Sequence, residues 1–435
     1  MTEQRAGGRQ QRVVVVGAGI GGLTAALSLH AAGIEVEVLE LAREIRPLGV
    51  GINILPSAVR ELVELGLGDA LAAAAVPTRE LAYHDRFGTR IWSEPRGVAA
   101  GYRWPQYSVH RGELQRLLLD AVHHRLGADA VHCGMAFERF EQTERQVRLE
   151  VRDRAAGRVI TRDADLLVGA DGIHSAVRGQ LHPEEGPPIW NGIHMWRGVT
   201  EAEPFLGGRT MIMAGSNRRA KFVAYPISRG RAAVNWVAEV RLGRGASVAP
   251  EDWHREARVD DVLPHFSRWH FDWLDVPGLI RGAPRIWEYP MVDRDPLPRW
   301  GTGRVTLLGD AAHPMYPIGS NGGSQAIIDA RALAWSLVHA EDPVAGRAAY
   351  ETARREPTAA IVLANRRMGP ERALAIIEER APGGFDRIEE VMSHDEIEAI
   401  VRAYQRTAGF DAAGLNAARS WSCPPSGSPV AVPAT

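Results

Sequence analysis

The segment from Arg12 to Glu40, RVVVVGAGIGGLTAALSLHAAGIEVEVLE, constrains the fold more than any other part of the chain. It opens with an unbroken valine run at 13–16, which is typical of a parallel strand buried on both faces. Three glycines in G-x-G-x-x-G spacing follow, then a helical pattern to about Ala32 and a second strand that ends in Glu40. A strand before the glycines, a helix after them and an acid about 20 residues on are the context that dinucleotide binding requires.

The residues of this segment have distinct expected tasks. Gly17 permits the tight turn, Gly19 leaves room for a pyrophosphate, and Gly22 lets the helix pack closely on the strand. The N-terminus of the helix directs its amide hydrogens and positive dipole end at the phosphates. The carboxylate of Glu40 is placed to accept hydrogen bonds from an adenosine ribose. We predict a dinucleotide site that is either NAD or FAD; the alternative is a strand-turn-helix unit whose glycines serve packing alone.

Composition excludes several classes of protein. At 435 residues, with 45% hydrophobic and 24% charged residues, the chain is typical of a soluble globular protein with a large core. With a net charge of -2, the chain lacks the excess of basic residues that is typical of proteins that bind nucleic acid or an acidic membrane surface. The chain has only 2 cysteines, which argues against a disulfide scaffold or a Cys-ligated metal, and no apolar run is long enough to span a membrane. We expect a cytoplasmic protein without a metal, and a monomer or a homodimer.

Two further strand-glycine corners occur later in the chain. The first is a buried strand at 166–168 that runs into Gly169-Ala170-Asp171-Gly172, which puts Asp171 at the strand end where ligands bind in open α/β sheets. Alone, Asp-Gly is only a turn signal. The second is a strand at 305–308 followed by Gly309-Asp310, where the Asp310 carboxylate can accept hydrogen bonds from a polyol chain. His313 nearby is better explained as a structural histidine than as a catalytic one.

The loop between Asp310 and the long helix that Ser324 opens is rich in glycine and proline. Pro317, Gly319, Gly322 and Gly323 leave backbone amides free at a helix N-terminus, and such amides stabilise a negative charge like the one that develops on a reduced flavin ring.

Two earlier positions and one region remain open to more than one interpretation. Gly49 and Gly51 flank Val50, so this loop is either mobile, close to a flat ligand, or a plain turn. Arg111 lies in the first turn of a helix, where the dipole disfavours a cation, so its partner is either the cofactor or a nearby carboxylate. Residues 183–300 are strand-like and hold eight of the 12 tryptophans, which either cover a flat apolar ligand or pack on their own core.

Taken together, the three motifs resemble those of the single-component FAD-dependent aromatic hydroxylases, the p-hydroxybenzoate and salicylate hydroxylase superfamily. The motifs are GAGIGG at 17–22, GADG at 169–172 and GDAAHPMYP at 309–317, and the resemblance covers about residues 12–370. Stretches such as EIRPLGVGINI, PQYSVHRGELQ and YPMVDRDPLP are similar to the branch that modifies phenazines, of the 5-methylphenazine-1-carboxylate 1-monooxygenase type. Asn321 and Ser324 replace the Gln and Asn of many relatives, which favours this branch over salicylate.

The resemblance implies an α/β fold with a Rossmann-like FAD-binding domain, in which helices cover a parallel sheet, together with an antiparallel-sheet substrate domain and C-terminal helices. The implied boundaries are 12–82, 108–182 and 296–345 for the FAD-binding domain, 83–107 and 183–295 for the substrate sheet, 346–410 for the C-terminal helices, and 411–435 for a disordered tail.

The implied activity is hydroxylation of an electron-rich aromatic compound with FAD, O2 and NADH or NADPH, through a flavin C4a-hydroperoxide. The branch implies that the substrate is a phenazine carboxylate, and transfer of OH to its carboxyl-bearing ring carbon would release CO2. Alternatives are hydroxylation of a simpler aromatic acid such as a hydroxybenzoate, and a non-oxygenating flavoprotein reductase. Because the chain has no second G-x-G-x-x-G unit, the nicotinamide is expected to visit transiently. The flavin carries the chemistry, so no catalytic side chain is expected.

The residues expected to contact the cofactor follow from the matched motifs. They are Gly17, Gly19, Ile20, Gly21, Gly22, Glu40, Arg43, Val50, Arg111, Asp171, Asp310, Pro317, Gly319, Asn321, Gly322 and Gly323. The residues expected to line the substrate pocket are Trp196, Met211, Tyr225 and Tyr289.

Overall fold

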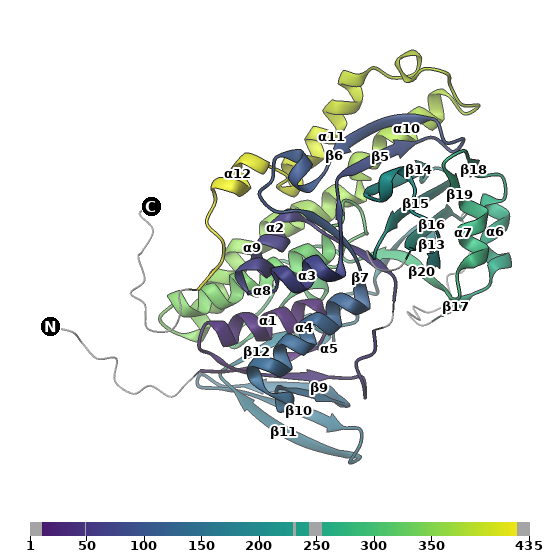
Figure 1. Cartoon of the computed structure of the whole chain (residues 1–435). Coiled ribbons are helices and arrows are strands. Elements are labelled where there is room, and N and C mark those ends of the chain that lie inside the picture. Colours follow the sequence, from purple (N-terminus) through teal and green to yellow (C-terminus); the bar gives the residue numbers. More distant parts are fainter. Residues whose placement is uncertain (1–10, 48, 229–231, 243–254, 424–435) are drawn as a thin grey trace.

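A five-stranded parallel sheet lies at the centre of the nucleotide-binding half of the molecule (Figure 1). The computed structural model describes residues 11–47, 49–228, 232–242 and 255–423. The strand order is β21-β12-β1-β2-β8 and every pair is parallel, so the carboxyl ends of the strands meet at one edge. The strands are β1 (Arg12–Val16), β2 (Glu35–Glu40), β8 (Val131–Cys133), β12 (Leu166–Gly169) and β21 (Val305–Leu307).

Helices cover this sheet and explain why its strands are so apolar. Helix α1 packs between α8 and α4, and α9 packs on the outside of α8. Almost every residue of α1 from Ile20 to Leu29 is buried, because the helix is enclosed by the sheet and by two other helices. The helices of this half are α1 (Ile20–Ala31), α2 (Pro56–Glu64), α3 (Gly68–Ala74), α4 (Arg111–Leu126), α5 (Ala176–Leu181), α8 (Gly322–His339) and α9 (Pro343–Arg366).

Two small antiparallel sheets extend this half. One contains β9 (Met135–Gln142), β10 (Val147–Asp153) and β11 (Arg158–Ala164), and it lies below the helices in Figure 1. The other contains β3 (Gly51–Ile54), β4 (Val76–Thr78) and β7 (Gln106–His110). Because β7 runs directly into α4 and pairs with β3, it places the start of α4 beside residue 51.

The second half is built on an eight-stranded mixed sheet of order β17-β20-β13-β16-β15-β14-β5-β6. All neighbours are antiparallel except β14 and β5. The strands are β5 (Glu80–His84), β6 (Arg90–Pro95), β13 (Ile189–Glu201), β14 (Thr210–Gly215), β15 (Ala220–Pro226), β16 (Ala233–Arg241), β17 (Glu256–Ala257) and β20 (Ile286–Asp293). A hairpin of β18 (His270–Phe271) and β19 (Leu274–Asp275) lies beside it.

Each face of this sheet has its own core. One face packs on α6 (Val259–Phe266) and α7 (Val276–Gly282). The other face packs on the C-terminal helices α10 (Arg372–Arg380) and α11 (His394–Ala408), which lie at the top of Figure 1. Successive side chains on a strand alternate between the two cores, so a side chain's position in the strand decides which core it joins.

The structure differs from the sequence-based expectation in two places. The region 183–300 was expected to be strand-like, but α6 and α7 also form there, short and each containing a proline. A disordered tail was expected from residue 411, but α12 (Ala412–Ala417) forms, and Arg60 donates hydrogen bonds to the carbonyls of Leu415 and Ala418. The expectation is therefore wrong for 411–423, and residues 424–435 lie outside the described part. The expected domain boundary at 82/83 falls inside β5.

Within the described ranges, no helix combines the length and the apolar character needed to cross a membrane. The same residues contain no group of three or more His, Cys, Asp or Glu side chains that could hold a metal ion.

We expect His84 to make the stability of the fold depend on pH. Burial lowers the pKa of His84 to about 4, whereas in the unfolded chain the pKa is about 6.5. Between these pH values the unfolded chain binds a proton at His84 that the folded chain does not. The contribution of neutral His84 to the free energy of unfolding is therefore complete above about pH 6.5 and is lost as the pH falls towards 4.

Urea unfolding of the wild type and of His84→Gln at pH 7.5, 6 and 5 measures this contribution. The variant should lose less stability on acidification than the wild type. Acidic groups that titrate in the same range are common to both proteins and cancel in the difference. Equal pH dependence of the two proteins would contradict the assignment.

Candidate functional site

The three strand-glycine corners meet at the carboxyl edge of the parallel sheet. Val16 pairs with Gly169 and Gly169 pairs with Leu307, so the residues that follow these strands emerge side by side. A Cβ on Gly17 would lie 2.5 Å from the Ala170 carbonyl oxygen and 3.0 Å from the Asp171 Cα. A Cβ on Gly21 would lie 2.8 Å from Leu308 Cδ2. Segments that are far apart in the sequence therefore form one edge.

The glycines of the first corner have different surroundings, which separate their roles. Gly17 has φ +104°, a conformation that glycine adopts readily. A Cβ on Gly22 would lie 1.9 Å from the Gly17 carbonyl oxygen, so the start of α1 has no room for a side chain there. Gly19 is different, because a Cβ on it would meet nothing within 4 Å. Gly17 and Gly22 are therefore needed for the backbone, whereas Gly19 borders open space.

The N-terminus of α1 is left without a side-chain partner. No side chain caps the helix and its first turn, which holds Ile20, Gly21 and Gly22, contains no acidic residue. The amide groups and the positive end of the helix dipole are therefore available for an anion. This uncapped start next to the space at Gly19 fits the pyrophosphate of the expected FAD.

Glu40 fixes the same turn from the end of β2. Its carboxylate oxygens accept hydrogen bonds from the amides of Ala18 and Ala42, each at 2.8 Å. Gln115 on α4 donates to the Ala18 carbonyl at 2.8 Å. A carboxylate has about four lone-pair sites, so Glu40 keeps acceptor capacity for a ribose. Arg43 lies exposed in the loop after β2, and no hydrogen bond of its side chain is seen in the described residues.

Asp171 is engaged in local structure. Its carboxylate accepts from Ser175 Oγ at 2.5 Å and from the Ala176 amide at 2.8 Å, so it caps the start of α5. Burial raises the pKa of Asp171 even though these hydrogen bonds lower it. The structure places Asp171 beside Gly17 as expected, but its carboxylate already has partners within the chain.

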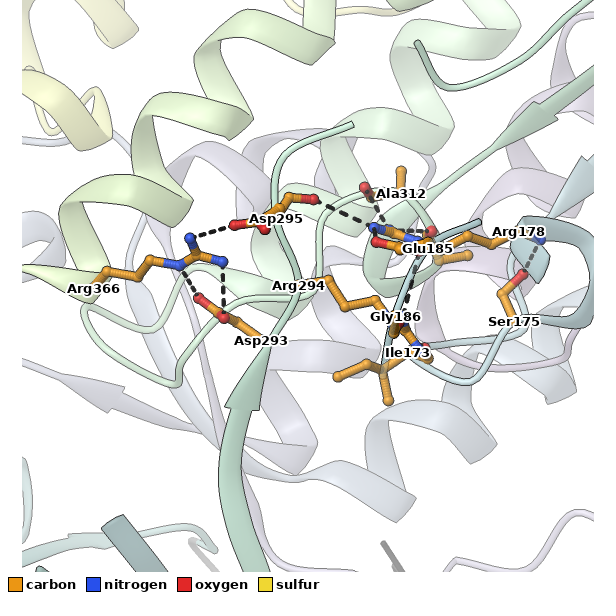
Figure 2. Close-up of polar contacts among 11 residues, drawn as sticks. Ile173, Ser175, Arg178, Glu185, Gly186, Asp293, Arg294, Asp295, Ala312 and Arg366 are labelled. Carbon is orange, nitrogen blue, oxygen red and sulfur yellow. Dashed lines mark hydrogen bonds and ion pairs between the residues drawn. The ribbon is translucent and has the colours of Figure 1, made fainter. Parts of the chain in front are cut away.

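A buried arginine joins the second and third corners (Figure 2). The Arg178 guanidinium donates to the carbonyls of Ala311 and Ala312 at 2.9 and 3.0 Å, and it forms a bidentate ion pair with Glu185. Arg294 donates to the Ile173 and Gly186 carbonyls in the same network. These bonds hold the loop after β12 against the loop after β21.

A second arginine attaches α9 to the same region. Arg366 forms a bidentate pair with Asp293 at the end of β20 and a further bond to Asp295 (Figure 2). Asp293 is fully buried, and its carboxylate together with burial raises the pKa of Tyr316 to about 12. Tyr316 therefore stays protonated at neutral pH.

Asp310 faces the start of α8. The side chain is exposed, and a Cβ on Gly322 would lie 3.8 Å from Asp310 Oδ1. The start of α8 has no side-chain cap and no acid in its first turn, so Gly322 and Gly323 present a second helix N-terminus at this edge. His313, by contrast, is buried and contacts Asp329 at 2.5 Å, which fits a structural role.

Val50 and Arg111, which are both expected to contact the cofactor, lie close together. The Arg111 amide donates to the Val50 carbonyl at 2.9 Å, and the Arg111 side chain is exposed. The backbone next to Val50 is fixed to the substrate sheet, because Gly51 donates to Asn235 Oδ1 at 2.5 Å and accepts from Arg197 at 2.8 Å. These bonds hold Gly51 in place in this conformation.

The loop that begins at Pro317 is held by a tyrosine from α11. Asn321 Nδ2 donates to Tyr404 Oη at 2.9 Å, and Tyr404 Oη lies 3.1 Å from the Ile318 carbonyl oxygen. Gly319 has φ +68°, and a Cβ on it would lie 2.1 Å from Tyr404 Oη. The Asn321 side chain therefore points into this buried network, while Pro317 is exposed.

A small pocket adjoins this loop. Its walls come from the loop at Gly319 and Ser320, from strands β5, β6 and β14, and from α11 and the residues after it. The apolar part of the lining includes Leu55, Leu81, Met211, Met213, Val401 and Phe410. The rest of the lining is largely polar, from Glu94, Arg96, Gln106, Ser320, Tyr404 and Gln405. Apolar walls combined with convergent polar groups are typical of a small-molecule site.

The four residues expected to line the substrate pocket lie on two different faces of the eight-stranded sheet. Met211 lines the pocket. Tyr225 and Tyr289 belong to the core on the pocket side and lie near Arg197, but they are not among the residues that line the pocket. Trp196 was assigned wrongly, because it belongs to the core on the opposite face and stacks on His265 of α6 at 5.8 Å. Its neighbour Met195 is the residue that points towards the pocket side.

Sequence reasoning missed several residues that position the site: Gln115, Arg178, Asn235 and Tyr404. Gln115 had a local signal, because it lies four residues after Arg111 and such residues share one helix face. The others contact partners far away in the sequence, such as Asn321 and Tyr404 at a separation of 83 residues. No local pattern marks these pairs.

Substitution of Gly19 tests whether it borders the expected FAD. Gly19→Ala should fold normally, because φ is -73° and a Cβ would meet nothing within 4 Å, yet it should weaken FAD binding at least about tenfold by occupying the pyrophosphate space. Gly22→Ala should instead destabilise the apoprotein itself, because its Cβ would overlap the Gly17 carbonyl.

Gly179→Ala is the matched control for this substitution. Gly179 is exposed on α5 and has open space around it. This variant should bind FAD like the wild type and unfold at the same or a slightly higher urea concentration. FAD titration of the apoproteins and urea unfolding measure both quantities. Normal FAD affinity of Gly19→Ala would contradict its assignment.

Removal of the Tyr404 hydroxyl should loosen the loop beside the expected flavin ring. Tyr404→Phe removes the hydroxyl that accepts from Asn321 Nδ2 and lies within hydrogen-bond distance of the Ile318 carbonyl and Asn365 Oδ1. This loss should cost about 1–3 kcal/mol of stability and should raise the fraction of O2 that is converted to H2O2. Tyr350→Phe is the control, because its hydroxyl also contacts a buried carbonyl, that of Leu307. Equal H2O2 release from both variants would contradict a positioning role for Tyr404.

Comparison with known proteins agrees with this geometry. Residues 10–365 match the family described as FAD binding domain. The chain is 53% identical over 374 residues to phenazine 1,6-dicarboxylic acid hydroxylase of Lysobacter antibioticus, covering 84% of this chain and 92% of that protein. It is 32% identical to 3-hydroxybenzoate 6-hydroxylase 1 of Aquipseudomonas alcaligenes, covering 80% and 86%.

A solved structure shows the same fold together with the cofactor. Klebsiella pneumoniae HpxO, complexed with FAD and uric acid, superposes with a TM-score of 0.70 at 27% identity, covering 92% of this chain and 93% of that chain. The three motifs, the edge that they share and these similarities lead to one conclusion. The chain belongs to the FAD binding domain family and is an FAD-dependent aromatic monooxygenase.

Proposed function

We propose that this monooxygenase hydroxylates a phenazine carboxylate, with NADH or NADPH as the transient reductant. The observation that carries the proposal is the 53% identity to a phenazine dicarboxylic acid hydroxylase over 84% of the chain. The hydroxybenzoate hydroxylases among the relatives are less similar, at about a third identity.

We assign the binding of FAD to the shared edge. The amides at the start of α1 would hold the pyrophosphate, Glu40 the adenosine ribose, and Asp310 the ribityl region. The amides at the start of α8 and the loop 317–323 would lie beside the isoalloxazine ring, where they can stabilise negative charge. When bound, FAD supplies the transfer of electrons from the nicotinamide and the activation of O2, so the chain needs no nucleophile of its own.

The pocket would then orient the substrate ring and exclude water. Met211 and Met213 are two residues apart on β14, so both side chains point to the pocket side of the sheet. Their unbranched side chains adapt to a flat ring. Phe410 and Val401 cover the pocket from the C-terminal side. Exclusion of water matters because oxygen activated in a wet site is released as H2O2 and not transferred to the substrate.

Turnover measurements test the proposal. The purified holoenzyme should oxidise NADH or NADPH in the presence of phenazine-1-carboxylate or phenazine-1,6-dicarboxylate and form a hydroxylated product with little H2O2. 3-Hydroxybenzoate should give slower turnover or mainly H2O2. Mass spectrometry of the product and measurement of CO2 distinguish simple hydroxylation from decarboxylative hydroxylation. Faster coupled turnover of 3-hydroxybenzoate than of either phenazine would refute the phenazine assignment.

A further inference from the structure

The pocket contains a charged pair that the hydroxylation chemistry does not use. Among its lining residues, the carboxylate and guanidinium groups belong to Glu94 and Arg96. Both come from the end of β6, and Arg96 is held there by a hydrogen bond from its amide to the Arg79 carbonyl at 2.8 Å. Burial of a charged pair costs desolvation free energy, so its presence calls for an explanation.

The acid of this pair already has strong neutral partners. The Tyr83 hydroxyl donates to Glu94 Oε1 at 2.6 Å, and Gln405 Nε2 donates to Glu94 Oε2 at 2.8 Å. Each carboxylate oxygen therefore has a short hydrogen bond that does not come from the arginine.

The arginine is much less well satisfied. Its contact with Glu94 is a single bond of 3.4 Å and the Tyr83 hydroxyl is a second hydrogen-bond partner, but the Arg96 Nε atom is buried without a hydrogen-bond partner. The guanidinium carbon lies 5.8 Å from the centre of the Phe410 ring, which also lines the pocket. A buried N–H group without a partner costs about 1–3 kcal/mol, and more when the group is charged.

The geometry points to Arg96 as the residue that receives a carboxylate of the aromatic substrate. A guanidinium presents paired N–H groups that match a carboxylate, and the bond is stronger when both groups are charged. With the carboxylate at Arg96, the aromatic ring would lie among Met211, Met213 and Leu55, next to the loop at Gly319. Arg96 thus selects for aromatic acids and against neutral rings of the same shape.

This inference rests on the proposed function, since it names the group of the substrate that is recognised. Its test compares Arg96→Gln with the wild type in binding phenazine-1,6-dicarboxylate, phenazine-1-carboxylate and unsubstituted phenazine, followed by the change in flavin absorbance or fluorescence. Arg96→Gln should bind both acids roughly 10- to 100-fold more weakly, a loss that matches one charge-assisted bond. Binding of unsubstituted phenazine should change less than about threefold. The affinity of Arg96→Lys for the acids should lie between those of the wild type and Arg96→Gln. Lysine keeps the positive charge but lacks the paired N–H groups of the guanidinium.

Arg90→Gln is the matched control. Arg90 lies on the same strand but is exposed and pairs with Glu80 at the surface, so its removal should leave binding of all three compounds unchanged. Flavin content and urea unfolding of each variant show whether it is folded. Equal weakening of acids and neutral phenazine in folded Arg96→Gln, or no weakening of the acids, overturns the inference.

The inference and the proposed function can fail separately. If the wild type binds no phenazine, the phenazine assignment fails, and the same comparison is made with 3-hydroxybenzoate and its neutral analogue phenol. If Arg96→Gln loses binding of 3-hydroxybenzoate but not of phenol, Arg96 still binds the substrate carboxylate, and only the identity of the aromatic ring changes. A wild type that binds neither acid more tightly than its neutral analogue overturns the role of Arg96 outright.

Discussion

The close approach of helix α1 to the turn before it is the constraint on which the rest of the site depends. A side chain at Gly22 would overlap the Gly17 carbonyl, so α1 can begin directly over the end of β1 only if residue 22 is glycine. That placement leaves the helix N-terminus uncapped at the carboxyl edge of the sheet, where the ends of β12 and β21 also emerge. In the proposed FAD site, charge on the cofactor would take the place of a capping side chain.

Two arginines fix the surroundings of this edge, of which Arg178 is buried and Arg366 is partly exposed. Arg178 connects the loop after β12 to the carbonyls at 311–312, and Arg366 connects α9 to the end of β20. Each is paired with a carboxylate and also reaches further oxygen atoms, which is the condition under which a buried charge is tolerated. Polar bonds of defined geometry therefore join the nucleotide-binding half to the sheet half close to the pocket.

Features with a local cause could be predicted from the sequence. The valine run, the glycine spacing and the acid after β2 identified the strands, the helix and the turn, because each depends on residues within about 30 positions. Helices α6 and α7 could not be predicted, because they are short, contain Pro264 and Pro277, and are stabilised by packing on the sheet. Trp196 was placed on the wrong face because Met195 beside it is also apolar, so the alternation of the strand was ambiguous. Tyr404 holds its loop through contacts between distant segments, for which the sequence holds no periodic signal.

The attachment of the Gly319 loop to Tyr404 makes the completeness of the pocket depend on α11, which is synthesised near the end of the chain. Domains form from the N-terminus onwards during translation. A nascent chain that has emerged as far as α8 already contains all three glycine corners, but the cover formed by α11 and Phe410 is still inside the ribosome. The covered pocket can therefore form only after the last helices have been synthesised and have packed on the sheet.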